Sequence, residues 1–96
     1  MDFELPARYI EFCKLGGLTD IRLKHRVLSP DEILRYRCEV PSNLVPFADD
    51  GCGDLFCWST DAGSGIDPAV IFYDQETQHS SPAAPSFTAW LAMHRL

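Results

Sequence analysis

Long apolar runs are missing from this chain of 96 residues. No segment approaches the ~20 consecutive apolar residues that a membrane-spanning helix needs. The first six residues, Met-Asp-Phe-Glu-Leu-Pro, lack the basic and then apolar pattern of a secretory signal. Repeats and low-complexity tracts are absent too, while 46% of the residues are hydrophobic, which excludes a disordered chain. We therefore expect one domain over residues 1–96, cytoplasmic and without a membrane partner.

Basic residues are almost absent from the second half of the chain. Residues 49–96 contain one, Arg95, against seven acidic residues, whereas residues 1–48 contain seven of each sign. The whole net charge of −6 therefore belongs to the second half. Because a negative surface repels phosphate backbones, we expect no nucleic-acid partner; a basic protein surface suits it better. Charge of this kind also serves solubility alone in many proteins.

The four cysteines form no CxxC pair. Cys52 and Cys57 have no second Cys or His pair nearby to complete a tetrahedral metal site. We expect free thiols, because disulfides are rare in a reducing cytoplasm. Cys13, Cys38 and Cys57 lie in apolar patterns and are expected to be small core residues.

Two segments in the first half have the apolar period of an amphipathic helix. The first begins at Leu5-Pro6, where proline suits the first turn, and ends at Gly16-Gly17. The second runs from about Pro30 to Cys38, behind a capping box of Ser29 and Glu32. Its expected buried residues are Ile33, Leu34 and Cys38.

Four segments are expected to be strands. Residues 21–28 alternate between apolar and polar side chains, as a strand with one solvated face does. Pro46 cannot donate to a ladder, so residues 44–48 are expected at a sheet edge or a strand start. Residues 54–60 and 69–73 are apolar on both faces, which is typical of central strands covered on both sides. We interpret residues 74–84, which include Pro82, as a polar loop.

The segment Asp-Asp-Gly-Cys-Gly-Asp, residues 49–54, has the composition of a turn. Its aspartates are expected to accept hydrogen bonds from backbone amides, while Gly51 and Gly53 adopt positive φ. Clustered carboxylates also bind cations, but the ligand spacing of a calcium loop is missing. With a last helix capped by Ser86, the order is helix, strand, helix, three strands, helix. This order predicts an α+β fold with a mainly antiparallel sheet packed against flanking helices.

Five segments carry a resemblance to a known family. They are Leu5-Pro6-x-x-Tyr9-x-x-Phe12, Gly16-Gly17, residues 45–58, Val70-Ile71-Phe72-Tyr73-Asp74 and Ala84-Pro85-Ser86-Phe87-Thr88-x-Trp90-Leu91. As an ordered set over nearly the whole chain, they resemble the SUKH superfamily of Smi/Knr-like immunity and regulator proteins. Members usually carry a further helix before the Leu-Pro-x-x-Tyr stretch, so the resemblance implies a short member in which this helix is missing.

The resemblance implies a non-enzymatic binding protein, and we expect no catalytic residue, metal or cofactor. Bacterial members typically bind and neutralise a cognate toxin, often a nuclease. A nuclease is positive where it holds phosphate, so carboxylates of an inhibitor can occupy that site, and we expect a basic toxin as partner. The expected partner-binding residues are loop carboxylates, with one aromatic anchor if its side chain faces outward: Asp49, Asp50, Asp61, Asp67, Tyr73, Asp74 and Glu76.

Two alternatives stay open. One is a scaffold or regulatory module of the cell-wall-regulator type, which has the same fold and a different partner. The other is a small hydrolase with Cys52 as nucleophile and His79 as base, although nothing in the sequence brings the two side chains together.

Overall fold

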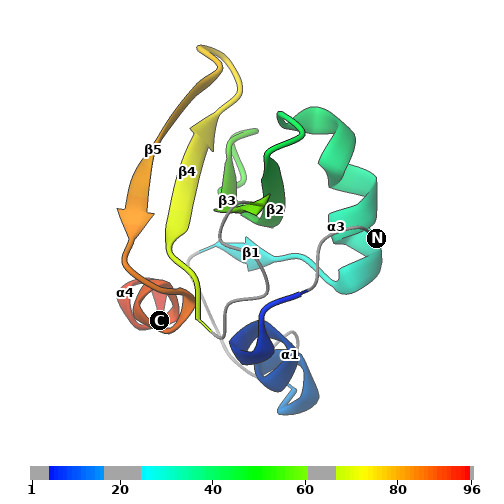
Figure 1. The fold of residues 1–96 in the computed structure, drawn as a ribbon, viewed down its shortest axis with the longest axis vertical. Helices are drawn as coiled ribbons and strands as arrows, with labels where there is room; N and C mark the ends of the chain where they lie inside the picture. Colours follow the sequence, from blue (N-terminus) through cyan, green and yellow to red (C-terminus); the bar gives the residue numbers. More distant parts are fainter. Residues whose placement is uncertain (1–4, 17–24, 61–66, 96) are drawn as a thin grey trace.

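The computed structural model describes residues 5–16, 25–60 and 67–95. Within this part of the chain, five antiparallel strands form one sheet in the order β1-β2-β3-β4-β5, accompanied by three α-helices (Figure 1). The elements are α1 (Ala7–Lys14), β1 (Arg26–Val27), α3 (Pro30–Tyr36), the 3-10 helix η1 (Arg37–Glu39), β2 (Leu44–Asp49), β3 (Leu55–Ser59), β4 (Val70–Asp74), β5 (His79–Ala84) and α4 (Phe87–His94). The α+β prediction with a mainly antiparallel sheet is confirmed.

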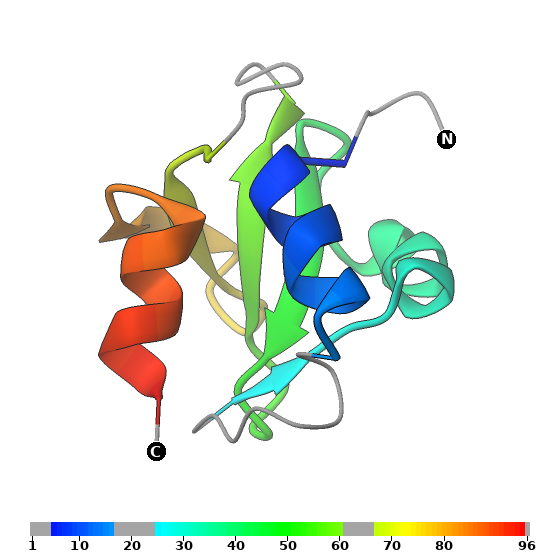
Figure 2. The same cartoon turned by 90° about the horizontal axis from the view of Figure 1, so that it is seen from below.

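The helices cover the sheet unequally. Figure 2 shows α1 and α4 on the same side of the sheet, while α3 lies beside β2 at the sheet's edge. The larger core fills the space under α1 and α4 and is mainly aromatic; the rings of Phe47 and Trp58 stack there with centroids 4.4 Å apart. None of the helices in the described ranges is long and apolar enough to cross a membrane.

The central strand β3 is apolar on both faces, as its sequence predicts. Phe56 and Trp58 pack into the core under α1 and α4. Leu55 and Cys57 point to the other face, where they join a smaller cluster with Leu44 and Tyr73. This second cluster is covered by the end of α3 and by Val40 rather than by a full helix, which leaves that face of the sheet partly open.

The helix boundaries follow their capping residues. The Ser29 hydroxyl accepts the Glu32 N–H at 3.3 Å, and the Glu32 carboxylate accepts the Ser29 N–H at 3.0 Å, so the capping box is confirmed. Ser86 caps α4 through the Ala89 N–H at 3.0 Å. Gly16, just beyond α1, has a φ of 79°, the left-handed conformation that glycine adopts at little cost.

The expected buried face of α3 is partly wrong. Ile33 is fully buried, but Leu34 is 52% exposed and Cys38 is exposed. Because α3 lies beside the sheet edge instead of flat on a face, only a narrow stripe of the helix meets the core. The prediction for Cys57 is confirmed, since it is buried, and Cys13 is half-buried.

Residues 79–84 form the edge strand β5, so the interpretation of 74–84 as a loop is wrong. His79 pairs with Asp74 across a turn of residues 75–78, in which Gln78 has a φ of 57°. The prediction that Pro46 lies at a sheet edge or a strand start is also wrong, because Pro46 is the third residue of β2, which lies between β1 and β3. It is tolerated there because β1 pairs only with Ala48 and Asp49. Of the expected strand 21–28, residues 21–24 lie outside the described residues.

Candidate functional site

Two hairpin turns meet at one end of the sheet. Because β2, β3, β4 and β5 are antiparallel neighbours, the β2–β3 turn and the β4–β5 turn lie at the same end. One oxygen of Asp54 accepts the backbone N–H of Gln75 at 3.1 Å, and the Gln75 side-chain amide donates to the Glu39 carbonyl at 3.1 Å. These bonds join both turns to η1. We call the carboxylates gathered here the acidic end: Glu39, Asp49, Asp50, Asp54, Asp74 and Glu76.

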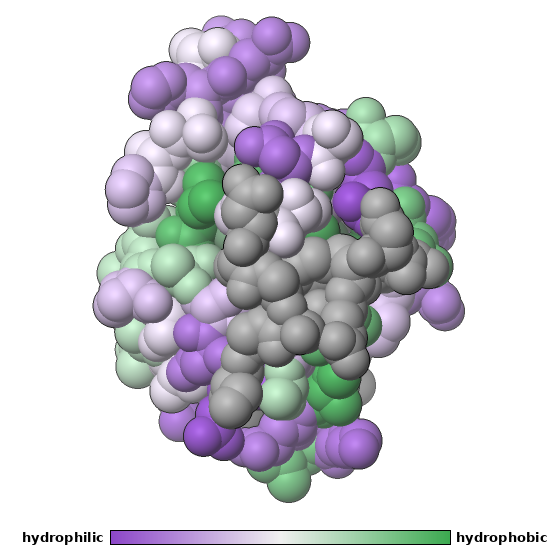
Figure 3. Space-filling model, in the orientation of Figure 1, coloured by the Kyte–Doolittle hydropathy of each residue, from purple (hydrophilic) through white to green (hydrophobic). Residues whose placement is uncertain are grey.

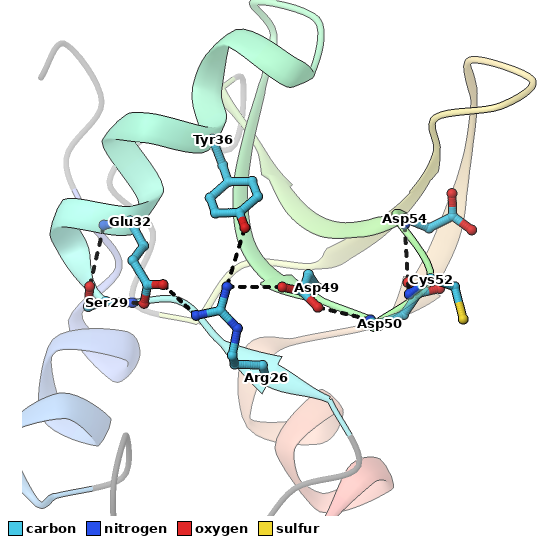
Figure 4. Close-up of polar contacts among 9 residues, drawn as sticks. Arg26, Ser29, Glu32, Tyr36, Asp49, Asp50, Cys52 and Asp54 are labelled. Carbon is cyan, nitrogen blue, oxygen red and sulfur yellow. Dashed lines mark hydrogen bonds and ion pairs between the residues drawn. The ribbon is translucent and has the colours of Figure 1, made fainter.

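Backbone amides hold the aspartates of the β2–β3 turn. Asp49 accepts the Gly51 N–H at 2.9 Å, and Asp50 accepts the N–H groups of Cys52 and Asp54 at 2.8 and 3.1 Å (Figure 4). Gly51 and Gly53 have φ values of 81° and 99°, which confirms the turn predicted from the sequence. The carboxylates therefore build the turn and are held in fixed positions by it.

The β4–β5 turn uses its aspartate in the same way. Asp74 accepts the N–H groups of Glu76 and Thr77 at 2.9 and 3.3 Å. Glu76 itself is exposed. Figure 3 shows hydrophilic residues gathered over this turn, at the top of the molecule.

Arg26 offsets part of the negative charge. Its guanidinium pairs with Glu32, with Asp49 at 3.1 Å and with the Tyr36 hydroxyl at 3.3 Å (Figure 4). The hydrogen bond to Glu32 raises the pKa of Arg26 above its ordinary value. The pKa of Glu32 is lowered, first by the Ser29 backbone N–H and then by Arg26. Asp49 is thus an internal ion-pair partner, while Glu39 and Glu76 stay exposed.

A hollow of about 380 Å³ opens between the turns and the end of α3. An aromatic ring, two carboxylates, a leucine, a glutamine and two glycines without side chains line it. These residues are Tyr36, Glu39, Asp49, Gly51, Gly53, Leu55 and Gln75. A long cationic side chain fits such a place, because its stem can pack on Tyr36 and Leu55 while its head meets carboxylates.

The other expected partner-binding residues lie elsewhere. Asp67 precedes β4 at the opposite end of the sheet, where it accepts the Thr88 N–H of α4 at 3.0 Å. Asp61 lies outside the described residues. Tyr73 is 6% exposed and packs in the smaller core cluster, so the outward orientation on which its anchor role depended is not found. Glu39 belongs to the acidic end and lines the hollow, but it is not among the residues predicted from the sequence, because the first half of the chain is neutral overall.

The thiols differ in their surroundings. Cys52 is exposed in the β2–β3 turn, and His79 is exposed at the start of β5. Burial raises the pKa of the Cys57 thiol to about 12, which keeps it protonated and unreactive. Burial also raises the pKa of Tyr9, whose hydroxyl donates to the Leu28 carbonyl at 2.6 Å. In the described part of the chain, no three His, Cys, Asp or Glu side chains are grouped to hold a metal ion.

Comparison with known proteins gives one match. The family model of the SMI1 / KNR4 family (SUKH-1) matches residues 1–93. No curated protein and no solved structure matches the chain. The family assignment thus rests on nearly the full sequence, in agreement with the motifs that carry the resemblance.

Proposed function

We propose, because the chain belongs to the SMI1/KNR4 (SUKH-1) family, that it is an immunity-type protein that binds and neutralises a cognate bacterial toxin. Members of this family are generally non-enzymatic, and those of bacteria typically pair with toxins. The family match is the single observation that carries the proposal. The protein then acts by covering its partner, and it catalyses no reaction of its own.

The acidic end supports a specific mode of binding. Its aspartates are already hydrogen-bonded to backbone amides, so little side-chain freedom is lost when a partner binds. Carboxylates fixed in this way attract a basic surface over long range and raise the association rate. A nuclease is the toxin class that suits such an inhibitor best, since its active site must be positive to hold phosphate.

The hollow supports a contact within this surface. Glu39 and Tyr36 stand on its α3 side, and the glycines of the β2–β3 turn form its opposite rim. We propose that a lysine or arginine of the toxin enters here. Glu76, on the neighbouring turn, extends the negative field around the entrance.

Co-expression tests the proposal directly. The gene beside the one encoding this protein is expressed in bacteria with and without it, and cell survival is measured. The proposal predicts that a large secreted toxin is encoded there and that co-expression restores growth. Death of both cultures, with the protein shown to be folded by circular dichroism, would contradict it.

A regulatory module of the cell-wall-regulator type is the alternative with the same fold. It predicts no toxin gene in the neighbourhood. It also predicts that pull-down from a lysate of the source cells recovers an endogenous protein that is not a toxin. Because the acidic end could bind a partner of either kind, the gene neighbourhood and the co-expression experiment are what distinguish an immunity protein from a regulatory module.

A further inference from the structure

We infer that His25 and His94 form a chelating site for a divalent transition-metal ion of the class of Zn²⁺, Ni²⁺ or Cu²⁺. His25 immediately precedes β1, and His94 is the last residue of α4. The fold brings their two half-buried imidazoles together, with ring centroids 4.6 Å apart and ring planes at 66°. This site is separate from the acidic end and does not depend on the proposed function.

Aromatic rings enclose the pair. The ring of Phe56 lies 5.0 Å from that of His25 and 5.5 Å from that of His94. Trp90 lies 6.4 Å and 5.1 Å from the same two rings. These contacts fix the positions of both imidazoles, so the two rings are held for a ligand before it arrives.

Two polar atoms of this cluster lack partners. Among the described residues, the Nδ1 atom of His25 and the Nε1 atom of Trp90 are buried and make no hydrogen bond. A buried polar atom without a partner costs free energy, which is recovered if a ligand binds there. A metal ion that accepts the lone pair of the imidazole nitrogen is such a ligand for His25.

The ring spacing agrees with chelation. An imidazole nitrogen lies about 2.0–2.1 Å from Zn²⁺, which places the ring centre about 3.2 Å from the ion. The nitrogen–metal–nitrogen angle is about 90° for neighbouring ligands in square-planar geometry and about 109° in tetrahedral geometry. Over this range of angles, the centres of two such rings lie about 4.5–5.2 Å apart. The observed 4.6 Å falls inside this range. Two protein ligands leave the remaining positions open, so the ion fastens the end of α4 to β1 with modest affinity.

Zinc titration of the whole protein tests the inference. Isothermal calorimetry is run under reducing conditions on the wild type, His25→Gln and His94→Gln. His79→Gln is the matched control, because His79 is an exposed histidine on β5. We expect one Zn²⁺ to bind the wild type and the control equally, and each of the other variants at least about tenfold more weakly.

Nitrogen NMR of the imidazole rings keeps the test independent of any folding defect in the variants. In the wild type, Zn²⁺ is expected to shift ring nitrogens of His25 and His94 and to leave those of His79 in place. Equal affinity in all four proteins would overturn the inference, because zinc would then be held by thiols or by other surface groups. Unmoved His25 and His94 signals at saturating zinc would overturn it as well.

Discussion

The Asp54 carboxylate accepts the backbone N–H of Gln75 at 3.1 Å and thereby ties the β2–β3 turn to the β4–β5 turn. Hairpin tips are ordinarily independent of one another and among the more mobile parts of a fold. Here one side chain makes the two tips a single surface. That surface is where most of the described carboxylates of the second half of the chain gather.

Removing this tie is expected to destabilise the protein. Asp54→Ala leaves the Gln75 N–H without its acceptor, and we expect the free energy of unfolding to fall by about 1 kcal/mol. Asp54→Asn keeps an acceptor oxygen and removes only the charge, so its free energy of unfolding is expected to lie within about 0.5 kcal/mol of the wild-type value. Urea denaturation measures both; equal losses in the two variants would show that the hydrogen bond is unimportant.

The capping box gives a second prediction. Ser29→Ala removes the hydroxyl that accepts the Glu32 N–H, and we expect a loss of about 1 kcal/mol in the free energy of unfolding. Ser42→Ala is the control, because Ser42 is exposed in the turn before β2 and caps no helix; its change is expected to stay within about 0.5 kcal/mol. The control losing as much as Ser29→Ala would rule out a capping effect.

Glu32 also makes stability depend on pH. Its pKa in the folded protein is lowered from an ordinary value of 4.5 by the Ser29 N–H and Arg26. A lowered carboxylate pKa means that the unfolded chain binds the proton more tightly. The stabilisation is therefore complete above the unfolded value and is lost as pH falls through the folded one.

The measurement is the free energy of unfolding between neutral pH and the acid range, for the wild type and Glu32→Gln. Glutamine keeps the size of the side chain and does not titrate, so the variant is expected to be less stable at neutral pH and to lose less on acidification. Parallel curves for the two proteins would contradict the assignment to Glu32.

Thiol labelling tests the environments of the cysteines. Near neutral pH the exposed thiols of Cys38 and Cys52 are expected to react first with a thiol reagent, and Cys57 only when the protein unfolds, because burial raises its pKa to about 12. Mass spectrometry of timed samples gives the order. The labelling rate of Cys52 also tests the hydrolase alternative: we expect the rate of an ordinary exposed thiol, and a greatly faster rate would revive a nucleophilic role.

Local signals in the sequence were sufficient for much of the fold. The caps at Ser29 and Ser86 and the positive φ of Gly51 and Gly53 depend on neighbours a few residues away, so the sequence indicates them directly. Apolar runs likewise identified β3. The strand β5 was missed because its Ser and Pro residues show no apolar alternation and its turn reaches positive φ at Gln78, without a glycine.

The site depended on contacts that sequence patterns do not contain. Charge counting identified the acidic half of the chain, but the antiparallel topology separates Asp67 from Asp74 at opposite ends of the sheet. The hydrogen bond from Gln75 brings Glu39 of the neutral half to the acidic end. The side chain of Tyr73 packs in the smaller core cluster with Leu55 and Cys57, and an all-apolar run does not show which face of β4 it occupies.

Association kinetics test the central claim, binding of a basic toxin through the acidic end, most directly. The association rate with the toxin identified by the rescue experiment is measured over a range of ionic strength for the wild type and Glu39→Lys/Glu76→Lys. Glu11→Lys/Asp31→Lys, on helices α1 and α3, carries the same change in charge away from the acidic end. We predict that the Glu39/Glu76 variant associates roughly fivefold or more slowly at low salt and depends less on salt, while the control stays closer to the wild type. Equal rates for the wild type and the Glu39/Glu76 variant at every salt concentration would contradict the claim.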